Sequence, residues 1–160
     1  MAVRVQTGDF DLTREVAQLR AAQGARASQI GAIATFTGTV RDMNENGGSV
    51  QAVSAMTLEH YPGMTERALE AIVAEARARW NIFDALVVHR VGPLYPQDQI
   101  VLVATVGTHR GEAFAACEFI MDYLKTRAPF WKKERTPEGE RWVDARSGDD
   151  AAADKWALPG

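Results

Sequence analysis

The alternation of apolar and polar positions predicts short strands separated by three helices. Apolar residues recur at helical spacing in three stretches: residues 12–19, the segment after Pro62, and residues 110–124. Asp11 is a candidate N-cap of the first helix, and Pro62 suits the first turn of the second helix. The third stretch is expected to turn Ala113, Phe114, Cys117, Met121 and Leu124 toward the core.

Strands are predicted between these helices. Residues 30–40 alternate between two faces, and residues 50–58 form a second strand. The run NENGGS, residues 44–49, is typical of a turn, so we expect these two strands to pair as an antiparallel hairpin. Further strands are expected over residues 83–91, 100–107, 130–135 and 141–145. Because hairpins outnumber possible crossovers, the predicted fold class is α+β with a mainly antiparallel sheet.

Length and composition narrow the class of protein. The chain has 160 residues, and residues 1–146 are predicted to form a single domain. Residues 147–160 are expected to be a loosely held C-terminal tail, in which Trp156 could dock. A formal net charge of −3 gives no bulk attraction to nucleic acid, and the most apolar stretch is too short for a membrane. A single cysteine and no apolar signal segment indicate a cytoplasmic location.

The strongest chemical signal is the stretch MDYLKTRAPFWKKE, residues 121–134. Pro129 ends the third helix and forces Ala128 out of the helical conformation, so the chain leaves the helix extended. Phe130 and Trp131 follow at once. The flanking cations are Lys125, Arg127, Lys132 and Lys133. This corner would suit an anionic, planar ligand; the alternative is a helix end whose cations complement the dipole, followed by a half-buried strand.

Within this stretch, Lys125 falls beneath Met121 on the helix and borders its buried face. A lysine that is partly desolvated among other cations has its ammonium form disfavoured and can act as a base or nucleophile. The alternative is an ordinary helical pair with Asp122, worth about a few tenths of a kcal/mol.

Other residues could also bind anions or carry chemistry. His109 and Arg110 open the third helix, where unpaired N–H groups favour anions, or they form an exposed first-turn pair. Arg41 closes a strand beside a glycine-rich loop and either holds an anion or is solvated. Cys117, on an apolar helix stripe, is expected to be a buried thiol, with a nucleophile as the alternative. The histidines lack ligand spacing, so we expect no metal or cofactor.

Six stretches together closely resemble one family, the large, catalytic subunit of molybdopterin synthase (the MoaE family). They are FTGTVRD (36–42), LEHYPGMTE (58–66), HRVGPL (89–94), THRGEAFAAC (108–117), MDYLKTRAPFWKKE (121–134) and WVDAR (142–146), in the family's order. One departure is Gln97, which stands where a turn glycine is expected.

The resemblance implies an α/β hammerhead fold and a central homodimer with a small ubiquitin-like partner at each end. This MoaD-like sulfur carrier ends in Gly-Gly, carried as a thiocarboxylate, and its tail enters a pocket of the large subunit. It donates sulfur to cyclic pyranopterin monophosphate, and two transfers make the dithiolene of molybdopterin. Because the sulfur arrives on the partner, no catalytic cysteine is required.

The resemblance also implies roles for single residues. Lys125 matches the catalytic lysine, and Lys132 matches a second lysine that positions the substrate or the acyl intermediate. Arg41 takes the position of the pocket arginine. His109 and Arg110 match a pair that reaches the pocket from the other protomer and binds the pterin phosphate. Further pocket-lining positions are matched by Phe36, Met121 and Arg146.

Two other functions stay open. The chain could be a non-catalytic scaffold that binds a ubiquitin-like tail, or an unrelated enzyme that acts on phosphate esters. Tail binding alone would not require both Lys125 and Lys132, which favours the sulfurtransferase. Whether Lys125 acts as a base, as an acid or through a covalent adduct is left open by the sequence.

Overall fold

A four-stranded sheet lies at the centre of the computed structural model, which describes residues 2–46, 49–143 and 147–157. Its strands, in spatial order, are β1 (Val3–Gln6), β6 (Ile82–Arg90), β8 (Gln99–Gly107) and β2 (Ala32–Thr39). β6, β8 and β2 pair antiparallel, whereas β1 joins β6 in parallel. The pairs described elsewhere in the chain are antiparallel, so the predicted α+β class with a mainly antiparallel sheet is confirmed.

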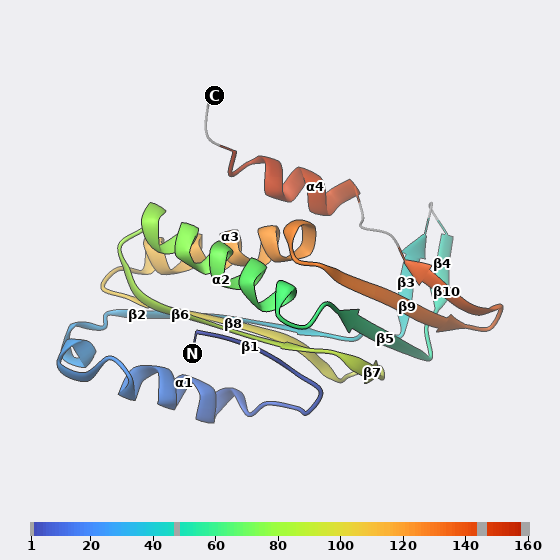
Figure 1. Ribbon diagram of the computed structural model, residues 1–160, viewed down its shortest axis with the longest axis horizontal. Coiled ribbons are helices and arrows are strands. Elements are labelled where there is room, and N and C mark those ends of the chain that lie inside the picture. The colour runs from blue at the N-terminus through green and yellow to red at the C-terminus, as the bar shows by residue number, and fades with distance from the viewer. Residues whose placement is uncertain (1, 47–48, 144–146, 158–160) are drawn as a thin grey trace.

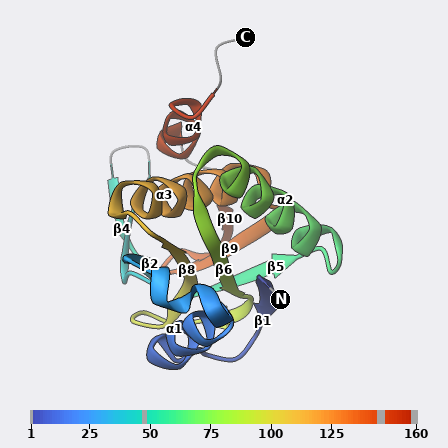
Figure 2. The same cartoon turned by 90° about the vertical axis from the view of Figure 1, so that its left-hand side faces the viewer.

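Helices cover both faces of this sheet (Figures 1 and 2). Helix α1 (Leu12–Ala21) lies on one face, followed by a short 3₁₀ helix, η1 (Gly24–Gln29), and helices α2 (Met64–Arg79) and α3 (Arg110–Arg127) lie on the other. Alternate residues of β6 point to opposite faces of the sheet. Leu86 and Val88 belong to the hydrophobic cluster beneath α1, and Ala85 and Val87 belong to the one beneath α2 and α3. Burial on both faces explains the continuous apolar run of this strand.

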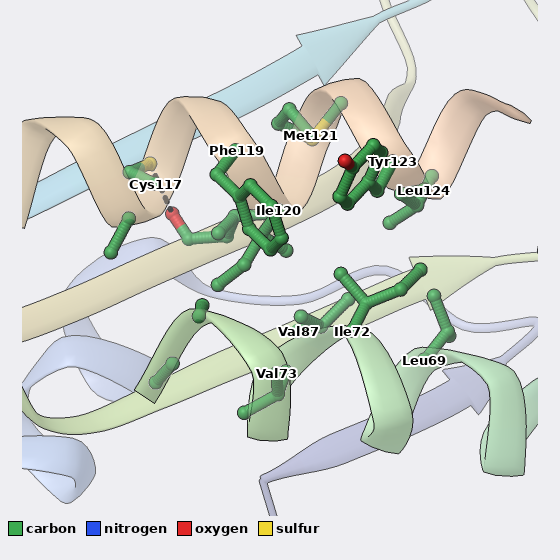
Figure 3. Packing of buried hydrophobic residues seen from close by; sticks show 14 of the residues in the cluster. Leu69, Ile72, Val73, Val87, Cys117, Phe119, Ile120, Met121, Tyr123 and Leu124 are labelled. Carbon is green, nitrogen blue, oxygen red and sulfur yellow. Dashed lines mark hydrogen bonds between the residues drawn. The ribbon is translucent and has the colours of Figure 1, made fainter. Parts of the chain in front are cut away.

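The main core lies between the central sheet and helices α2 and α3 (Figure 3). Phe119 and Ile120 of α3 are fully buried against the α2 side chains Leu69 and Ile72. The prediction that Phe114 also faces inward was wrong, because its side chain is 65% exposed. The buried stripe of this helix follows i, i+3, i+4 and i+7 positions, and Phe114 falls outside it. The stripe includes Ala113, Ala116, Cys117 and Ile120, and the other buried residues of α3 are Phe119, Met121, Tyr123 and Leu124.

Helix starts follow local capping chemistry. The Asp11 side chain accepts a hydrogen bond from the backbone N–H of Arg14 at 3.0 Å, as predicted for an N-cap. Pro62 does not lie in the first turn of α2. Gly63 is the N-cap instead, with a φ of 84°, and its N–H donates to the side chain of Glu66. A left-handed residue at the cap turns the chain before the helix begins, and glycine adopts that conformation without steric cost.

A second sheet and a two-stranded ribbon lie beyond the end of the central sheet (Figure 1). The second sheet has the order β10 (Gly139–Val143), β9 (Phe130–Thr136), β5 (Ala55–His60) and β7 (Gly92–Leu94). The ribbon pairs β3 (Met43–Asn46) with β4 (Ser49–Ala52).

The predicted hairpin between residues 30–40 and 50–58 was therefore wrong. β2 pairs with β8, and β5 pairs with β9 and β7, so the two segments belong to different sheets. Of the turn-forming run, residues 44–46 lie in β3 and residue 49 in β4, and these two strands pair with each other instead. β2 pairs instead with the buried, apolar strand β8, and this long-range contact decides the partner.

The C-terminal segment is packed rather than loosely held. Helix α4 (Ser147–Asp154) lies against α3 (Figures 1 and 2). Beyond it, Trp156 packs edge-on against Trp80 at 5.3 Å between ring centroids, and its indole N–H donates to Asp122 Oδ2 at 2.6 Å. The prediction that Trp156 could dock is thus confirmed. Within the described part of the chain, no helix has the length and apolarity needed to cross a membrane.

Candidate functional site

A pocket of about 520 Å³ opens where the end of β2, the last turn of α3 and the second sheet meet. Much of its wall is apolar, including Met56, Leu58 and Leu124. The cationic side chains that line it are Arg41, Lys125 and Lys132. Cations set against apolar walls favour a ligand that carries both negative charge and apolar surface.

The two lysines reach this pocket from opposite sides of a corner in the chain. Lys125 lies in the last turn of α3, and Ala128 already has extended backbone, with ψ of 133°. Pro129 prevents the helix from continuing, and β9 begins at the next residue. The extended chain then carries Lys132 back to the pocket that Lys125 lines. The sequence predicted this corner correctly.

Strand alternation separates the residues after the corner. Lys132 lines the pocket, whereas Lys133 pairs with Glu140 on the other face, at 3.0 Å between Nζ and Oε2. The two aromatic residues separate in the same way. Phe130 lines the pocket, but Trp131 packs edge-on against Tyr61 at 4.6 Å between centroids and is 40% exposed. The expectation that both rings form the pocket wall was therefore only half right.

Lys132 is held by a buried carboxylate that sequence reasoning did not single out. The side chain of Glu134 is 1% exposed, and its Oε1 lies 3.4 Å from Lys132 Nζ. Its Oε2 lies 3.3 Å from Nη2 of Arg141, on the neighbouring strand β10. A buried carboxylate requires charged partners, so Glu134 ties both cations to one place.

His89, near the end of β6, is a pocket residue that the sequence analysis missed. Its Nδ1 lies 2.8 Å from the carbonyl oxygen of Arg90, and its ring stacks on Phe130 at 3.9 Å between centroids. Burial, together with the positive charge of Lys125, lowers the pKa of His89 to about 4. The ring is therefore neutral at pH 7. A histidine within the apolar run ALVVHRV was the available sequence signal.

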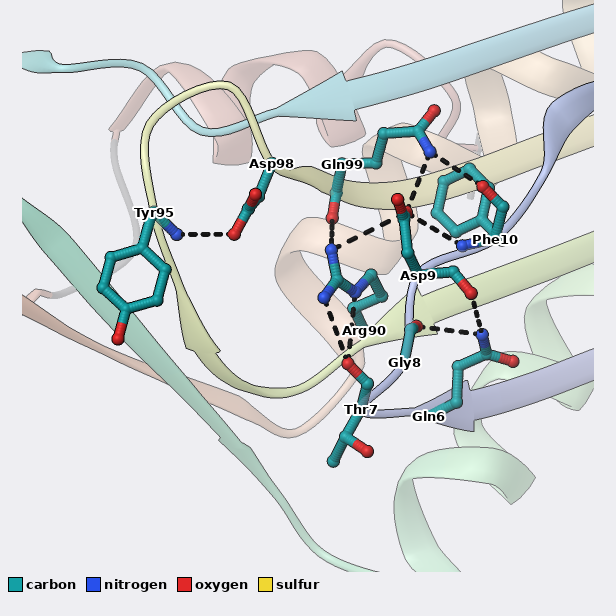
Figure 4. Close-up of polar contacts among 9 residues, drawn as sticks. All are labelled: Gln6, Thr7, Gly8, Asp9, Phe10, Arg90, Tyr95, Asp98 and Gln99. Atoms are coloured by element: carbon teal, nitrogen blue, oxygen red, sulfur yellow. Dashed lines mark hydrogen bonds and ion pairs between the residues drawn. The ribbon is translucent and has the colours of Figure 1, made fainter.

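The carbonyl that His89 contacts belongs to a residue with an anchored side chain (Figure 4). Nη1 of Arg90 donates to the carbonyl of Gln99 at 2.9 Å, and Nε and Nη2 both donate to the carbonyl of Thr7 at 3.2 Å. Asp9 Oδ1 lies 3.7 Å from Nη1. These contacts fix the end of β6 against β8 and the segment after β1.

The remaining predicted site residues divide into three groups. Phe36 and Met121 line the pocket together with Arg41 and the two lysines. His109 and Arg110 lie at the opposite end of α3, are exposed and do not line it. Arg146 lies outside the described residues. The chain therefore brings five of the eight predicted residues to one pocket.

Of two further side chains, Asp149 departs from the sequence analysis and Cys117 agrees with it. Asp149 of α4 lines the pocket, although this segment was expected to be a loose tail. Cys117 is buried, and burial raises the pKa of its thiol to about 11. The thiol therefore stays protonated at neutral pH, which agrees with the core interpretation. The described residues contain no group of three or more His, Cys, Asp or Glu side chains that could hold a metal ion.

This fold and pocket define a class of protein: an α+β domain whose pocket, lined by two lysines, an arginine and an apolar wall, suits an anionic ligand. Comparison with known proteins gives the family. The family model described as MoaE protein matches residues 5–127, so the chain belongs to the MoaE family.

Individual relatives agree with this assignment. The chain is 62% identical over 156 residues to the molybdopterin synthase catalytic subunit of Ralstonia nicotianae, covering 98% of this chain and 84% of that protein. The solved MoaE protein of Burkholderia ambifaria has 62% identity and a TM-score of 0.79, covering 99% of this chain and 100% of the other. A molybdopterin synthase structure from Staphylococcus aureus has 28% identity and a TM-score of 0.77, covering 90% of this chain and 98% of the other.

Proposed function

We propose that this chain is the catalytic subunit of a cytoplasmic molybdopterin synthase. It transfers sulfur from the C-terminal thiocarboxylate of a small ubiquitin-like subunit to cyclic pyranopterin monophosphate. The observation that carries the proposal is the convergence of Lys125 and Lys132, from either side of the Pro129 corner, on one pocket with Arg41. Membership of the MoaE family supports the same reaction.

The chemistry of the two ligands fits this pocket. A Gly-Gly tail has no side chains, so a site can recognise only its backbone and its terminal charge. The ammonium groups of Lys125 and Lys132 would hold the anionic end of the tail as the thiocarboxylate becomes a carboxylate. The guanidinium group of Arg41 suits a phosphate or carboxylate, and the apolar wall accommodates the planar pterin.

A homodimer completes the proposed enzyme. Arg110 and Lys125 are fifteen residues apart on one helix, or roughly 22 Å at 1.5 Å per residue, which one small pterin does not bridge. His109 and Arg110 would therefore serve the pocket of the partner protomer. The edge strand β2 and the start of α3 carry exposed apolar side chains that a second copy could cover: Ile33, Phe36 and Phe114, exposed by 36%, 43% and 65%.

Reconstitution tests the function directly. The chain is mixed with a thiocarboxylated ubiquitin-like partner and cyclic pyranopterin monophosphate, and molybdopterin is measured. We expect molybdopterin with this partner and none with the same partner carrying an ordinary carboxylate. Deleting the two terminal glycines should abolish transfer and weaken binding. If the partner binds but no molybdopterin forms, the chain is the non-catalytic scaffold instead.

A further inference from the structure

We propose that His89 is a specificity-determining residue of this pocket, whose Nε2 atom accepts a hydrogen bond from an N–H group of the bound ligand. The identity of that ligand rests on the proposed function. The residue itself is defined by the fold: His89 is 5% exposed, lines the pocket and stacks on Phe130.

The hydrogen-bond partner of Nδ1 sets the tautomer of this ring. A carbonyl oxygen can only accept, so the 2.8 Å contact with the Arg90 carbonyl requires the proton on Nδ1. In a neutral ring, Nε2 then carries a lone pair and no proton. The carbonyl cannot easily move away, because the Arg90 side chain is bonded to Thr7 and Gln99 (Figure 4).

The surroundings keep the ring in this neutral form. Burial disfavours the charged imidazolium, and positive charge on Lys125 and His60 adds to the effect, giving a pKa of about 4. At neutral pH Nε2 is therefore a permanent acceptor. Stacking on Phe130, with an angle of 20° between the rings, fixes the plane in which this acceptor points.

Nε2 of His89 is a neutral acceptor in a pocket whose cations only donate and whose other acceptors include the carboxylate of Asp149. Arg41, Lys125 and Lys132 bind the oxygen atoms of anions, which cannot pair with Nε2. The complementary group is an N–H donor. Two donors occur in the proposed reaction: the ring N–H groups of the pterin and the backbone amides of the Gly-Gly tail. Both donors offer the same N–H group to Nε2. They are distinguished by recording the His89 imidazole resonances with each ligand added separately.

Nitrogen NMR on the wild-type protein, labelled with ¹⁵N-histidine, tests the proposal without a mutation. The free protein should show His89 with Nδ1 protonated and Nε2 bare at pH 7. Addition of cyclic pyranopterin monophosphate should shift the Nε2 resonance if the pterin is the donor. Addition of the carboxylate form of the partner should do so if the tail is the donor, and the partner lacking both glycines should not. No Nε2 shift with either ligand, or a proton on Nε2 in the free protein, overturns the proposal.

Two matched variants test the consequence for the reaction. His89→Asn keeps a donor near Nδ1 for the Arg90 carbonyl but removes the acceptor, whereas His89→Gln keeps an acceptor near the Nε2 position. Loss of one hydrogen bond should raise KM for the donor-bearing ligand roughly tenfold in the Asn variant, with Gln restoring most of the affinity. Equal KM values for wild type and the Asn variant contradict the role of His89 while leaving the proposed function intact. If the wild-type protein makes no molybdopterin, the proposed function is contradicted. The role of His89 is still tested in that case, because the NMR experiment depends only on ligand binding.

Discussion

At the residue scale, Lys125 combines an exposed side chain with a place in the wall of the pocket. Removing it leaves the buried stripe of α3 untouched, so we expect Lys125→Ala to keep its fold. Loss of a positioned acid, base or charge-stabilising group should slow sulfur transfer by about 10²–10⁴. Single-turnover formation of molybdopterin measures the rate, and thermal unfolding checks the fold.

Arg127→Ala is the matched control for this change. Its guanidinium group also lies in the last turn of α3, but it bonds Glu75 at 3.1 Å and covers the ring of Tyr123 at 3.7 Å, away from the pocket. Transfer by the folded control should stay close to the wild-type rate. Near-normal turnover by Lys125→Ala would remove this lysine from the catalytic role.

Gln97 is the residue whose type conflicts most clearly with its backbone. Its φ is 79°, and it is the one non-glycine residue with positive φ in the described part of the chain. The left-handed conformation costs a non-glycine residue about 1–2 kcal/mol, which a glycine would not lose. Because glycine is also more flexible in the unfolded chain, about half of this stabilisation is offset. We expect Gln97→Gly to raise the free energy of unfolding by roughly 0.5–1 kcal/mol in urea titrations.

The reverse change provides the control for Gln97. Gly24 has a φ of 58°, and a Cβ atom added there would meet no atom within 4 Å. Gly24→Ala therefore isolates the backbone effect and should destabilise the fold by about 1 kcal/mol. A destabilising Gln97→Gly would mean that side-chain contacts of Gln97 outweigh the strain of its backbone.

At the scale of elements, the register of β9 decides which lysine serves the pocket. Lys132 lines the pocket and Lys133 pairs with Glu140 on the opposite face. Lys132→Ala should therefore clearly slow sulfur transfer, whereas Lys133→Ala should have little effect. Lys132 also forms an ion pair with the buried Glu134, so the variant should lose stability as well. Rates are compared per folded molecule, with the folded fraction taken from urea titrations. A more damaging Lys133→Ala would show that the register of the strand is different in solution.

Helix ends that are set by local chemistry were predicted well, but the pairing partners of the strands were not. The end of α3 before Pro129 follows from the geometry of proline, and the N-cap of α1 at Asp11 follows from its side-chain hydrogen bond. The strands at residues 30–40 and 50–58 were found in the sequence, but their pairing depends on segments far along the chain. The parallel strand β1 was missed for the same reason, because its register is set by β6.

At the scale of the whole molecule, the proposed active site is shared between two protomers. His109 and Arg110 lie at one end of α3, and the pocket lies at the other. Arg110→Ala and Lys125→Ala chains should each be nearly inactive alone. When mixed and allowed to exchange subunits, they should regain activity, because a heterodimer carries one site with both groups intact. Molybdopterin formation is measured alongside mass spectrometry of the mixed dimers. Subunit exchange without recovery would place both residues in one protomer's site or leave Arg110 structural.

The sequence by itself determined the fold class, the N-cap of α1, the end of α3 with its cationic corner at Pro129 and the family resemblance, because these depend on residues close together in the chain. Tertiary structure alone decided which residues share the pocket. Phe130 faces it and Trp131 does not, because β9 pairs with β5 in one register. His89 and Asp149 join it from two other positions in the chain, Glu134 holds Lys132 by an ion pair, and α4 becomes part of the site by packing on α3. Side-chain burial and strand pairing depend on contacts between distant segments, and no local pattern encodes them.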